Sequence, residues 1–494
     1  MAAKPLQGAP GGVGYDLLVK GGTVVSPDGM RAVDIGVRAG KVAALLSPDE
    51  PVFARESLVV DGLHILPGCI DPHHHLWEPG FCAKSDFSDG TRTAIAGGVT
   101  TIIDHPLTIP EVLDRGILEE KARIGEETSY CDFALHGGVS ASNHKELAGL
   151  WEAGATAFKI FMCESGSAVE QLDDADLLSA LRHIGAIGGI ALFHAENQRL
   201  LDYYEAKVRA TGRGDPLTLT DWRPPEVEVE AINRATYFCE ISGAKGVFIH
   251  TSVPEGCDIA SAARDRGVSV VVETCPHYLY LTTTDLAERG PWIKCQPPVR
   301  DPARVQRLWQ HLSRGDIVMI GSDHGPVHKA LKERGRDDMW AAQGGLPSVE
   351  TMIPLMLDAV SAGKLTLGQF VSLASTYAAR WYGLYPRKGI IAPGADADFT
   401  VVDLNATWRV QAENLEGPTG WTPFEGRMVR GRVRFTVVRG CIVAVDGKPT
   451  THAHPGYGRF YRADHTHAGD LAHAQPGGPG GDRRSPAATP GDRY

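Results

Sequence analysis

Residues 70–80 read IDPHHHLWEPG and place three consecutive histidines, His73, His74 and His75, at the end of an apolar run that is predicted to be a strand. Histidines at the end of a strand are either metal ligands or part of a polar turn that follows a buried strand. The segment alone does not distinguish these interpretations. The decision depends on whether other strands of the chain end in residues of matching chemistry.

Seven further apolar runs follow this one, and most are separated by helix-like segments such as residues 171–183 and 226–241. In order, the eight runs are HILPGCID, GVTTIIDH, CDFALHGGV, ATAFKIFM, GIALFHAE, GVFIHTS, VSVVVET and DIVMIGSD. Short buried strands that alternate with helices are typical of α/β proteins, and eight such units are the number in a (β/α)8 barrel. We therefore predict a barrel over residues 63–384.

The two ends of the chain have a different pattern. Residues 1–62 and 385–460 contain short runs of alternating apolar and polar residues, separated by Gly and Asp turns. We predict that these two segments form one small β-sandwich. Residues 464–494 are rich in Gly, Pro and charged residues with almost nothing to bury, so we expect a disordered tail. The histidines of this tail are more consistent with a solvated segment than with a metal site.

Composition restricts the class of protein. The chain has 494 residues, of which 43% are apolar, and a net charge of −11, which disfavours nucleic acid as a partner. The nine cysteines are scattered, as reduced thiols are in a cytoplasmic protein. The beginning of the sequence lacks the apolar core of a signal peptide, and no stretch is apolar enough to span a bilayer. We expect a cytoplasmic protein that binds no membrane.

The ends of the predicted strands carry the candidate site. Reactive groups of barrel enzymes lie at the carboxyl ends of the strands. The polar residues at these ends are His73, His75, Lys159, His194, His250 and Asp323. Each alone has a structural explanation: a histidine at a buried edge, or Asp323 as a helix N-cap. Because all six fall at the same end of their strands, we predict a metal centre.

Lys159 is the unusual member, since a cation within an apolar strand is costly unless it is paired or chemically changed. If its amine captures CO₂, the resulting carbamate has two oxygens that are able to bridge two metals. Two Zn²⁺ ions opposed by a carbamate, an aspartate and a hydroxide leave one net positive charge. Histidine and carboxylate oxygen ligands suit zinc, although cobalt, manganese or iron fit such a site as well.

The chain resembles the cyclic amidohydrolases, a family that includes dihydroorotases, allantoinases, hydantoinases and dihydropyrimidinases. The resemblance extends from about residue 15 to about residue 460. Besides the six candidate ligands, it rests on the segments AGGVTTIIDHP, RPPEVEVEAI, ETCPHYLYL, KCQPPVRD, GSDHGP and KGIIAPGADADF.

The resemblance implies a function and a ligand set. It implies that His73, His75, carboxylated Lys159, His194, His250 and Asp323 hold two Zn²⁺ ions, and that His74 points away from the site. It further implies hydrolysis of a cyclic amide by a hydroxide between the metals, with Asp323 as general base and then acid. Members of the family assemble as tetramers or dimers, so a homo-oligomer is expected.

Differences from the family pattern bear on the ring that is hydrolysed. Dihydroorotases have an arginine two residues after the second metal histidine, where this chain has Trp77, and indole cannot pair with a carboxylate. Hydantoinases and dihydropyrimidinases place a tyrosine five residues after the metal lysine, where this chain has Glu164. The closest resemblance is to the allantoinases, which implies hydrolysis of allantoin to allantoate in purine catabolism.

Two positions also differ from the allantoinases, because Gln343 replaces a tryptophan and His105 replaces a methionine. We therefore take Trp77, His105, Glu164, Gln296 and Gln343 as candidate substrate contacts, although Trp77 fits equally well as a loop anchor. The alternatives are a hydantoinase, dihydropyrimidinase or other cyclic-imide hydrolase, and a non-catalytic oligomeric scaffold. A scaffold of this family is expected to lack ligand residues, and all six are present here.

Overall fold

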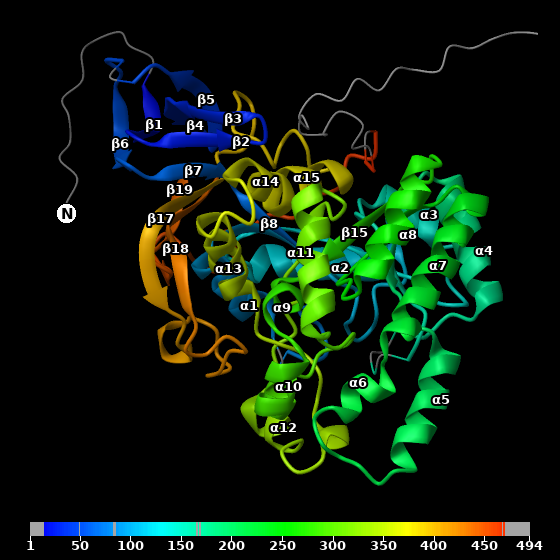
Figure 1. Ribbon diagram of the computed structural model, residues 1–494. Helices are drawn as coiled ribbons and strands as arrows, with labels where there is room; N and C mark the ends of the chain where they lie inside the picture. The colour runs from blue at the N-terminus through cyan, green and yellow to red at the C-terminus, as the bar shows by residue number, and fades with distance from the viewer. Residues whose placement is uncertain are drawn as a thin grey trace, which may run out of the picture.

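The computed structural model describes residues 14–48, 50–82, 85–164, 166, 169–466, 468 and 469. These residues form a barrel of parallel strands surrounded by helices, with a two-sheet β-sandwich beside it (Figure 1). The sandwich contains strands from both ends of the chain. The predicted α/β class, the barrel and the small sandwich are therefore confirmed.

All eight apolar runs supply a strand of the barrel. The strands are β8 (Cys69–His74), β9 (Val99–Asp104), β10 (Asp132–Leu135), β12 (Phe158–Phe161), β13 (Ile190–His194), β14 (Lys245–Phe248), β15 (Val270–Thr274) and β16 (Met319–Ile320). The short β11 (Gly137–Gly138) continues the chain from β10 and pairs with β12. A parallel bridge between His74 and His324 joins the last strand to the first. Every strand thus ends at the same rim.

Helices follow the strands and cover the outside of the barrel (Figure 1). Their bounds are α1 (Phe87–Ala96), α2 (Arg115–Thr128), α3 (Leu147–Glu152), α4 (Asp174–Ala186), α5 (Gln198–Arg209), α6 (Thr218–Trp222), α7 (Pro225–Ser242), α8 (Pro254–Asp265), α9 (Pro276–Tyr280), α10 (Thr283–Arg289), α11 (Pro302–Arg314), α12 (Lys329–Glu333), α13 (Val349–Ser361), α14 (Leu367–Val371) and α15 (Tyr377–Trp381). Helices α2, α4 and α11 are each preceded by an aspartate whose carboxylate accepts hydrogen bonds from first-turn amides.

The first apolar run, HILPGCID, divides between the sandwich and the barrel. Strand β7 (His64–Pro67) pairs with β2 and β17 of the sandwich, whereas β8 begins the barrel at Cys69. Gly68 lies between them, and a Cβ there would stand 2.2 Å from Thr100 Oγ1. The chain passes this point closely because glycine has no side chain. The sandwich therefore continues five residues past the expected boundary at residue 62.

The sandwich consists of a four-stranded and a seven-stranded sheet. The first has the order β5 (Lys41–Leu46), β4 (Asp34–Arg38), β1 (Tyr15–Lys20), β6 (Ala54–Val59). The second has the order β20 (Lys448–Pro449), β19 (Cys441–Val445), β18 (Met428–Val438), β17 (Phe399–Arg409), β7, β2 (Thr23–Ser26), β3 (Gly29–Ala32). A separate apolar cluster that includes Val19, Ile35 and Phe399 fills the space between residues of both chain ends.

Buried ion pairs connect the sandwich to the barrel. Lys388 Nζ lies 2.5 Å from both Asp132 Oδ2, at the start of β10, and Asp398 Oδ2, just before β17. Arg439 pairs with Asp132 from the sandwich side. Removing one partner of such a network leaves a buried charge unpaired, which is strongly destabilising. These contacts fix the two parts relative to each other.

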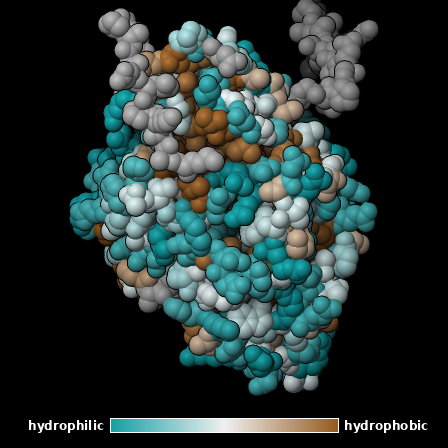
Figure 2. Space-filling view, turned by 90° about the vertical axis from the view of Figure 1, so that its left-hand side faces the viewer, coloured by the Kyte–Doolittle hydropathy of each residue, from teal (hydrophilic) through white to brown (hydrophobic). Residues whose placement is uncertain are grey.

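The outer face of the sandwich side carries apolar and polar regions. Figure 2 shows hydrophobic residues gathered in the upper part of this face, whereas hydrophilic residues cover most of the lower part. Met30 and Val59, on sandwich strands, are 59% and 55% exposed. Among the described residues, no helix has both the length and the apolar character needed to cross a membrane.

The segment that follows residue 460 packs against the barrel. The amide of Asp464 donates to Gly383 O at 2.8 Å, and the ring of His465 stacks on Trp151. The contacts of Asp464 and His465 thus lie within the segment that we expected to be disordered. Residues 467 and 470–494 of that segment lie outside the described residues.

Candidate metal centre and substrate cavity

The barrel brings the six candidate ligands to one rim. His73, Lys159 and His194 lie in β8, β12 and β13, and His75, His250 and Asp323 follow β8, β14 and β16 by one to three residues. Lys159, His75, His194, His250 and Asp323 line a common cavity of about 250 Å³. His73 lies directly beneath this lining, with its ring 5.2 Å from those of His75 and His250.

His73, His75 and Asp323 form the tightest group. Asp323 Oδ1 lies 3.0 Å from His75 Nε2 and 3.3 Å from His73 Nε2. Burial raises the pKa of Asp323, but the two neighbouring imidazoles outweigh burial and hold that pKa well below its usual value. The carboxylate is therefore ionised and close to two nitrogens, as a metal site requires.

His194 and His250 form the second group, with ring centroids 4.7 Å apart. His194 Nε2 lies 2.8 Å from Glu196 Oε2, and Glu196 is also paired with Arg223. A carboxylate accepts, so Nε2 carries the hydrogen and Nδ1 of His194 keeps its lone pair. His250 Nδ1 is buried without a hydrogen-bond partner among the described residues.

Buried histidine nitrogens without a hydrogen-bond partner among the described residues indicate whether a metal fits this site. His73 donates from Nδ1 to Glu273 Oε1 at 2.7 Å, which leaves Nε2 with a lone pair and, in the described part of the chain, without a hydrogen-bond donor. Buried polar atoms are seldom left unpaired, because each costs free energy. Together with the lone pair on Nδ1 of His194 and the ionised Asp323, the donor set fits a divalent metal.

Lys159 is buried, with only 1% of its surface exposed. It forms no ion pair with a carboxylate of the described residues, and its Nζ lies 4.7 Å from the centre of the Phe161 ring. Burial lowers the pKa of Lys159 to about 7, against the opposing effect of Asp323 and Glu273. A large fraction of the amine is thus neutral near pH 7 and able to act as a nucleophile.

Two of the candidate ligands have left-handed backbone conformations. The φ angles are +39° at His250 and +47° at Asp323, values that residues other than glycine rarely adopt. Each residue lies where the chain leaves its strand for the following loop. Such strain is found at functional sites, where the surrounding structure holds a side chain in one direction.

Two buried carboxylates support the histidines and were not predicted. Glu273, in β15, accepts from His73 Nδ1 and from the amide of His250 at 3.2 Å, and Glu196 accepts from His194. Burial raises the pKa of Glu273 well above its usual value. The sequence signal was a glutamate inside or directly after an apolar run, VSVVVET and GIALFHAE. Which ligand each one contacts depends on the barrel.

The candidate substrate contacts divide into two groups. Trp77, Gln296 and Gln343 line the cavity, together with the backbone of Gly344 and Gly345. Trp77 also packs on an apolar cluster formed by Leu107, Phe161 and Val169, so one wall of the cavity is apolar.

His105 and Glu164 are not among the described residues that line the cavity. The ring of His105 is buried and stacks on His73 at 4.2 Å, so His105 lies behind the metal ligands. Glu164 is exposed because the chain turns outward after β12, and its amide donates to Gln198 Oε1 at 2.7 Å. The structure thus places neither residue where we expected it.

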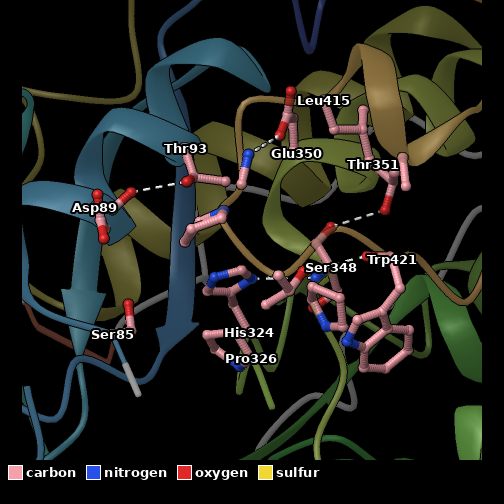
Figure 3. Close-up of a pocket in the computed structure, with 15 residues that line it drawn as sticks. Ser85, Asp89, Thr93, His324, Pro326, Ser348, Glu350, Thr351, Leu415 and Trp421 are labelled. Atoms are coloured by element: carbon pink, nitrogen blue, oxygen red, sulfur yellow. Dashed lines mark hydrogen bonds between the residues drawn. The ribbon is translucent and has the colours of Figure 1, made fainter. Parts of the chain in front are cut away.

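His74 points away from the cavity, as expected. Its Nδ1 lies 2.9 Å from Asp71 Oδ2, and its ring stacks on His324 at 4.8 Å. His324 in turn accepts at Nδ1 from the amides of Ser348 and Val349, and Figure 3 shows it at a small neighbouring cavity with Pro326 and Trp421. The three consecutive histidines are thus two residues of the site and one structural residue.

Comparison with known proteins agrees with this geometry. The amidohydrolase family matches residues 64–443. The chain belongs to the amidohydrolase family. This amidohydrolase is 34% identical over 451 residues to the L-hydantoinase of Paenarthrobacter aurescens, which covers 90% of this chain and 98% of that protein. It is 36% identical over 438 residues to the allantoinase of Deinococcus radiodurans, covering 88% and 96%.

Solved structures resemble this amidohydrolase over almost their whole length. The L-hydantoinase (dihydropyrimidinase) from Arthrobacter aurescens superposes with a TM-score of 0.88 at 33% identity, covering 90% of this chain and 99% of that one. A D-hydantoinase superposes with a TM-score of 0.85 at 32% identity, covering 91% and 99%. The barrel and sandwich are therefore the arrangement of the hydantoinases.

Proposed function

We propose that this amidohydrolase opens a cyclic ureide by hydrolysing a ring C–N bond, and that allantoin is its substrate. The observation that carries the proposal is that five of the six candidate ligands line one cavity with Gln296 and Gln343, and that the sixth, His73, lies directly beneath this lining. Allantoin is a hydantoin ring with a ureido substituent, so the relatives named allantoinase and L-hydantoinase point to the same ring. The two glutamine amides suit the hydrogen-bonding groups of the ureido substituent.

We also propose that two zinc ions occupy the site. His73, His75 and Asp323 would hold one ion and His194 and His250 the other, with carboxylated Lys159 between them. The neutral Lys159 amine forms an N–C bond to CO₂ and releases a proton to solvent, which gives a carbamate anion. Metal ions bound in such a site lower the pKa of water to about 7 and polarise a carbonyl oxygen.

The residues of the chain have distinct parts in this proposal. Asp323 is ionised and lies at the cavity, so its carboxylate is able to take the proton of the attacking water. It then returns that proton to the ring nitrogen as the C–N bond breaks. Gln296 and Gln343 hold the ureido substituent, and the wall of Trp77 and Phe161 excludes water from one side of the ring.

A hydantoin with an apolar substituent at carbon 5 is the second candidate. The observation in its favour is the apolar cluster of Leu107, Phe161 and Val169 with Trp77 beside it. Such a wall binds an apolar side chain better than a ureido group, because burying a polar group without a partner costs free energy. The two candidates share the ring and the metal site and differ only in the substituent.

The first experiment is ring opening by the zinc-loaded protein with allantoin, hydantoin, 5-benzylhydantoin, dihydrouracil and dihydroorotate, with zinc content measured in the same samples. We expect two zinc ions per chain and the highest kcat/KM for allantoin. A higher value for 5-benzylhydantoin would favour the second candidate, and no ring opening of any substrate would refute the proposed function.

A lysine variant tests the carbamate. Lys159→Ala is expected to lose zinc and activity together, whereas Lys145→Ala, at an exposed lysine, is expected to keep both. Full activity of Lys159→Ala with two bound zinc ions would rule out the carbamate.

A further inference from the structure

Another cavity, of about 350 Å³, lies between the end of α1, helix α13 and the sandwich strands β17, β18 and β20. It shares no lining residue with the cavity of the metal centre. The lining residues used below are Glu350, Trp408, Arg409, Gln411, Arg432, Asp446 and Lys448. Cavities of several hundred Å³ with a few convergent polar groups are typical ligand sites. The proposed function gives this cavity no role.

Among the described residues, two arginines at this cavity have no acidic partner. In the described part of the chain, neither Arg409 nor Arg432 forms an ion pair with a carboxylate. Arg409 donates to Gly426 O at 3.1 Å, and Arg432 donates to Asp446 O in a long bond of 3.4 Å. The carboxylate of Asp446 itself lies 2.8 Å from Arg434. Both guanidinium groups therefore keep positive charge that is free to bind an anion.

Three further charged residues line the cavity: Asp446, whose carboxylate is paired with Arg434, and Lys448 and Glu350. Lys448 shares Glu416, at 3.2 Å, with Arg92, which lies 2.7 Å from that carboxylate. Glu350 accepts from the amides of Glu416 at 2.8 Å and Gly417 at 3.1 Å, and Figure 3 shows its carboxylate turned to this backbone. Burial raises the pKa of Glu350 to about 7, so it is partly neutral near that pH.

Trp408 gives the cavity a flat apolar surface beside Arg432. The Arg432 Cζ atom lies 5.9 Å from the centre of the Trp408 ring, and the indole Nε1 donates to Gly431 O at 3.1 Å. Because this hydrogen bond holds the Trp408 ring in place, the ring limits the positions that the Arg432 guanidinium can take. The planar arginine fork matches a carboxylate with two parallel hydrogen bonds. The side-chain amide of Gln411 adds a further hydrogen-bonding group to the lining.

We propose that this cavity binds a small organic carboxylate with a flat unsaturated group, the carboxylate on Arg432 and the flat group on Trp408. Phosphate shares the oxyanion chemistry, but it has no planar part to lie on an indole ring. The site is separate from the metal centre, so its occupation does not depend on the proposed function. Its ligand would be a second molecule bound by the chain, in addition to the substrate.

Diffraction from crystals of the zinc-loaded protein soaked in 4-bromobenzoate locates the ligand, because bromine is found by its anomalous signal. We expect bromine beside Trp408, with the carboxylate on Arg432. Bromine only at the metal centre, or at no ordered position, would overturn the proposal. Calorimetric titration with benzoate and with inorganic phosphate measures affinity in solution.

Arginine variants connect the titration to this cavity. Arg432→Gln is expected to weaken benzoate binding at least about 10-fold, since it removes both the positive charge and the two parallel N–H donors of the guanidinium. Arg432→Lys, which keeps the charge, should bind more tightly than Arg432→Gln. Arg430→Gln is the matched control, since Arg430 lies on the same strand, is exposed and does not line the cavity. Equal loss in Arg432→Gln and Arg430→Gln, or tighter binding of phosphate than benzoate, would overturn the assignment.

Discussion

His73 Nδ1 lies 2.7 Å from Glu273 Oε1, and both side chains are completely shielded from solvent. This hydrogen bond determines which nitrogen of His73 keeps its lone pair. We expect Glu273→Gln to lower zinc affinity about 10- to 100-fold, because the neutral amide supports the imidazole less strongly. Zinc retained during dialysis against a chelator measures this effect. Glu164→Gln, at an exposed site, is the control, and equal zinc retention in both variants would exclude a role for Glu273.

Asp323 is the only carboxylate among the six candidate ligands. Asp323→Asn is expected to keep at least one zinc ion through the histidines, but to lower kcat at least about 100-fold, the usual effect of removing a general acid–base group. Zinc analysis and steady-state kinetics on the same preparation separate the two functions. Near-normal turnover would show that another group moves the proton.

His105 fills a buried position behind the metal ligands. Its ring stacks on His73 at 4.2 Å and tilts against His75 at 4.8 Å, and within the described structure neither ring nitrogen has a hydrogen-bond partner. We expect His105→Met to raise the free energy of unfolding by about 1 kcal/mol or more, since it removes buried unpaired nitrogens. KM should stay unchanged because His105 is not among the residues that line the cavity. A KM several-fold higher would instead place His105 in contact with substrate.

The barrel and the candidate ligands could be predicted because both depend on local pattern. Each apolar run is long enough for one buried strand, and the residue at its end reaches the rim by the geometry of parallel strands. Lys159 could be recognised because a cation stood inside an apolar run. The division of the first run at Gly68 could not be predicted, since it depends on Thr100 and Asp398, which are distant in the sequence.

The supporting residues and the cavity lining depend on contacts between distant segments. Glu273 meets His73 across 200 residues of sequence, and only the closed barrel brings β15 to β8. Spacing from Lys159 suggested that Glu164 faces the substrate, but the loop after β12 turns it outward. Arg432 and Trp408 belong to a cavity with no sequence motif, so neither residue could be singled out from the sequence.

The apolar and polar walls of the metal-centre cavity are expected to affect substrate specificity in opposite directions. Trp77→Ala removes apolar surface and is expected to lower kcat/KM for 5-benzylhydantoin about 10-fold, with a smaller effect on allantoin. Gln343→Ala removes a hydrogen-bonding amide and is expected to lower kcat/KM for allantoin more than for 5-benzylhydantoin. The ratio of kcat/KM for allantoin to kcat/KM for 5-benzylhydantoin, measured for each variant, shows which substituent each wall contacts. Parallel loss for both substrates would mean that these walls hold the ring and not its substituent.

Glu350 makes stability depend on pH. Burial raises its pKa in the folded chain from the usual 4.5 to about 7. Between these values the folded chain keeps a proton that the unfolded chain releases. The free energy of unfolding therefore falls as pH rises from about 4.5 to about 7, by up to about 3 kcal/mol, and this contribution is constant above that range.

We expect Glu350→Gln to remove this decline, because the amide does not ionise. The thermal midpoint of the variant relative to the unsubstituted protein should rise from pH 5 to pH 7.5. Calorimetry at one scan rate, with Glu152→Gln as the control at an exposed position of α3, measures this difference. A difference that is constant with pH would mean that the Glu350 carboxyl has an ordinary pKa. It would then be fully ionised near pH 7, and the net positive charge of the cavity that it lines with Arg432 would be smaller.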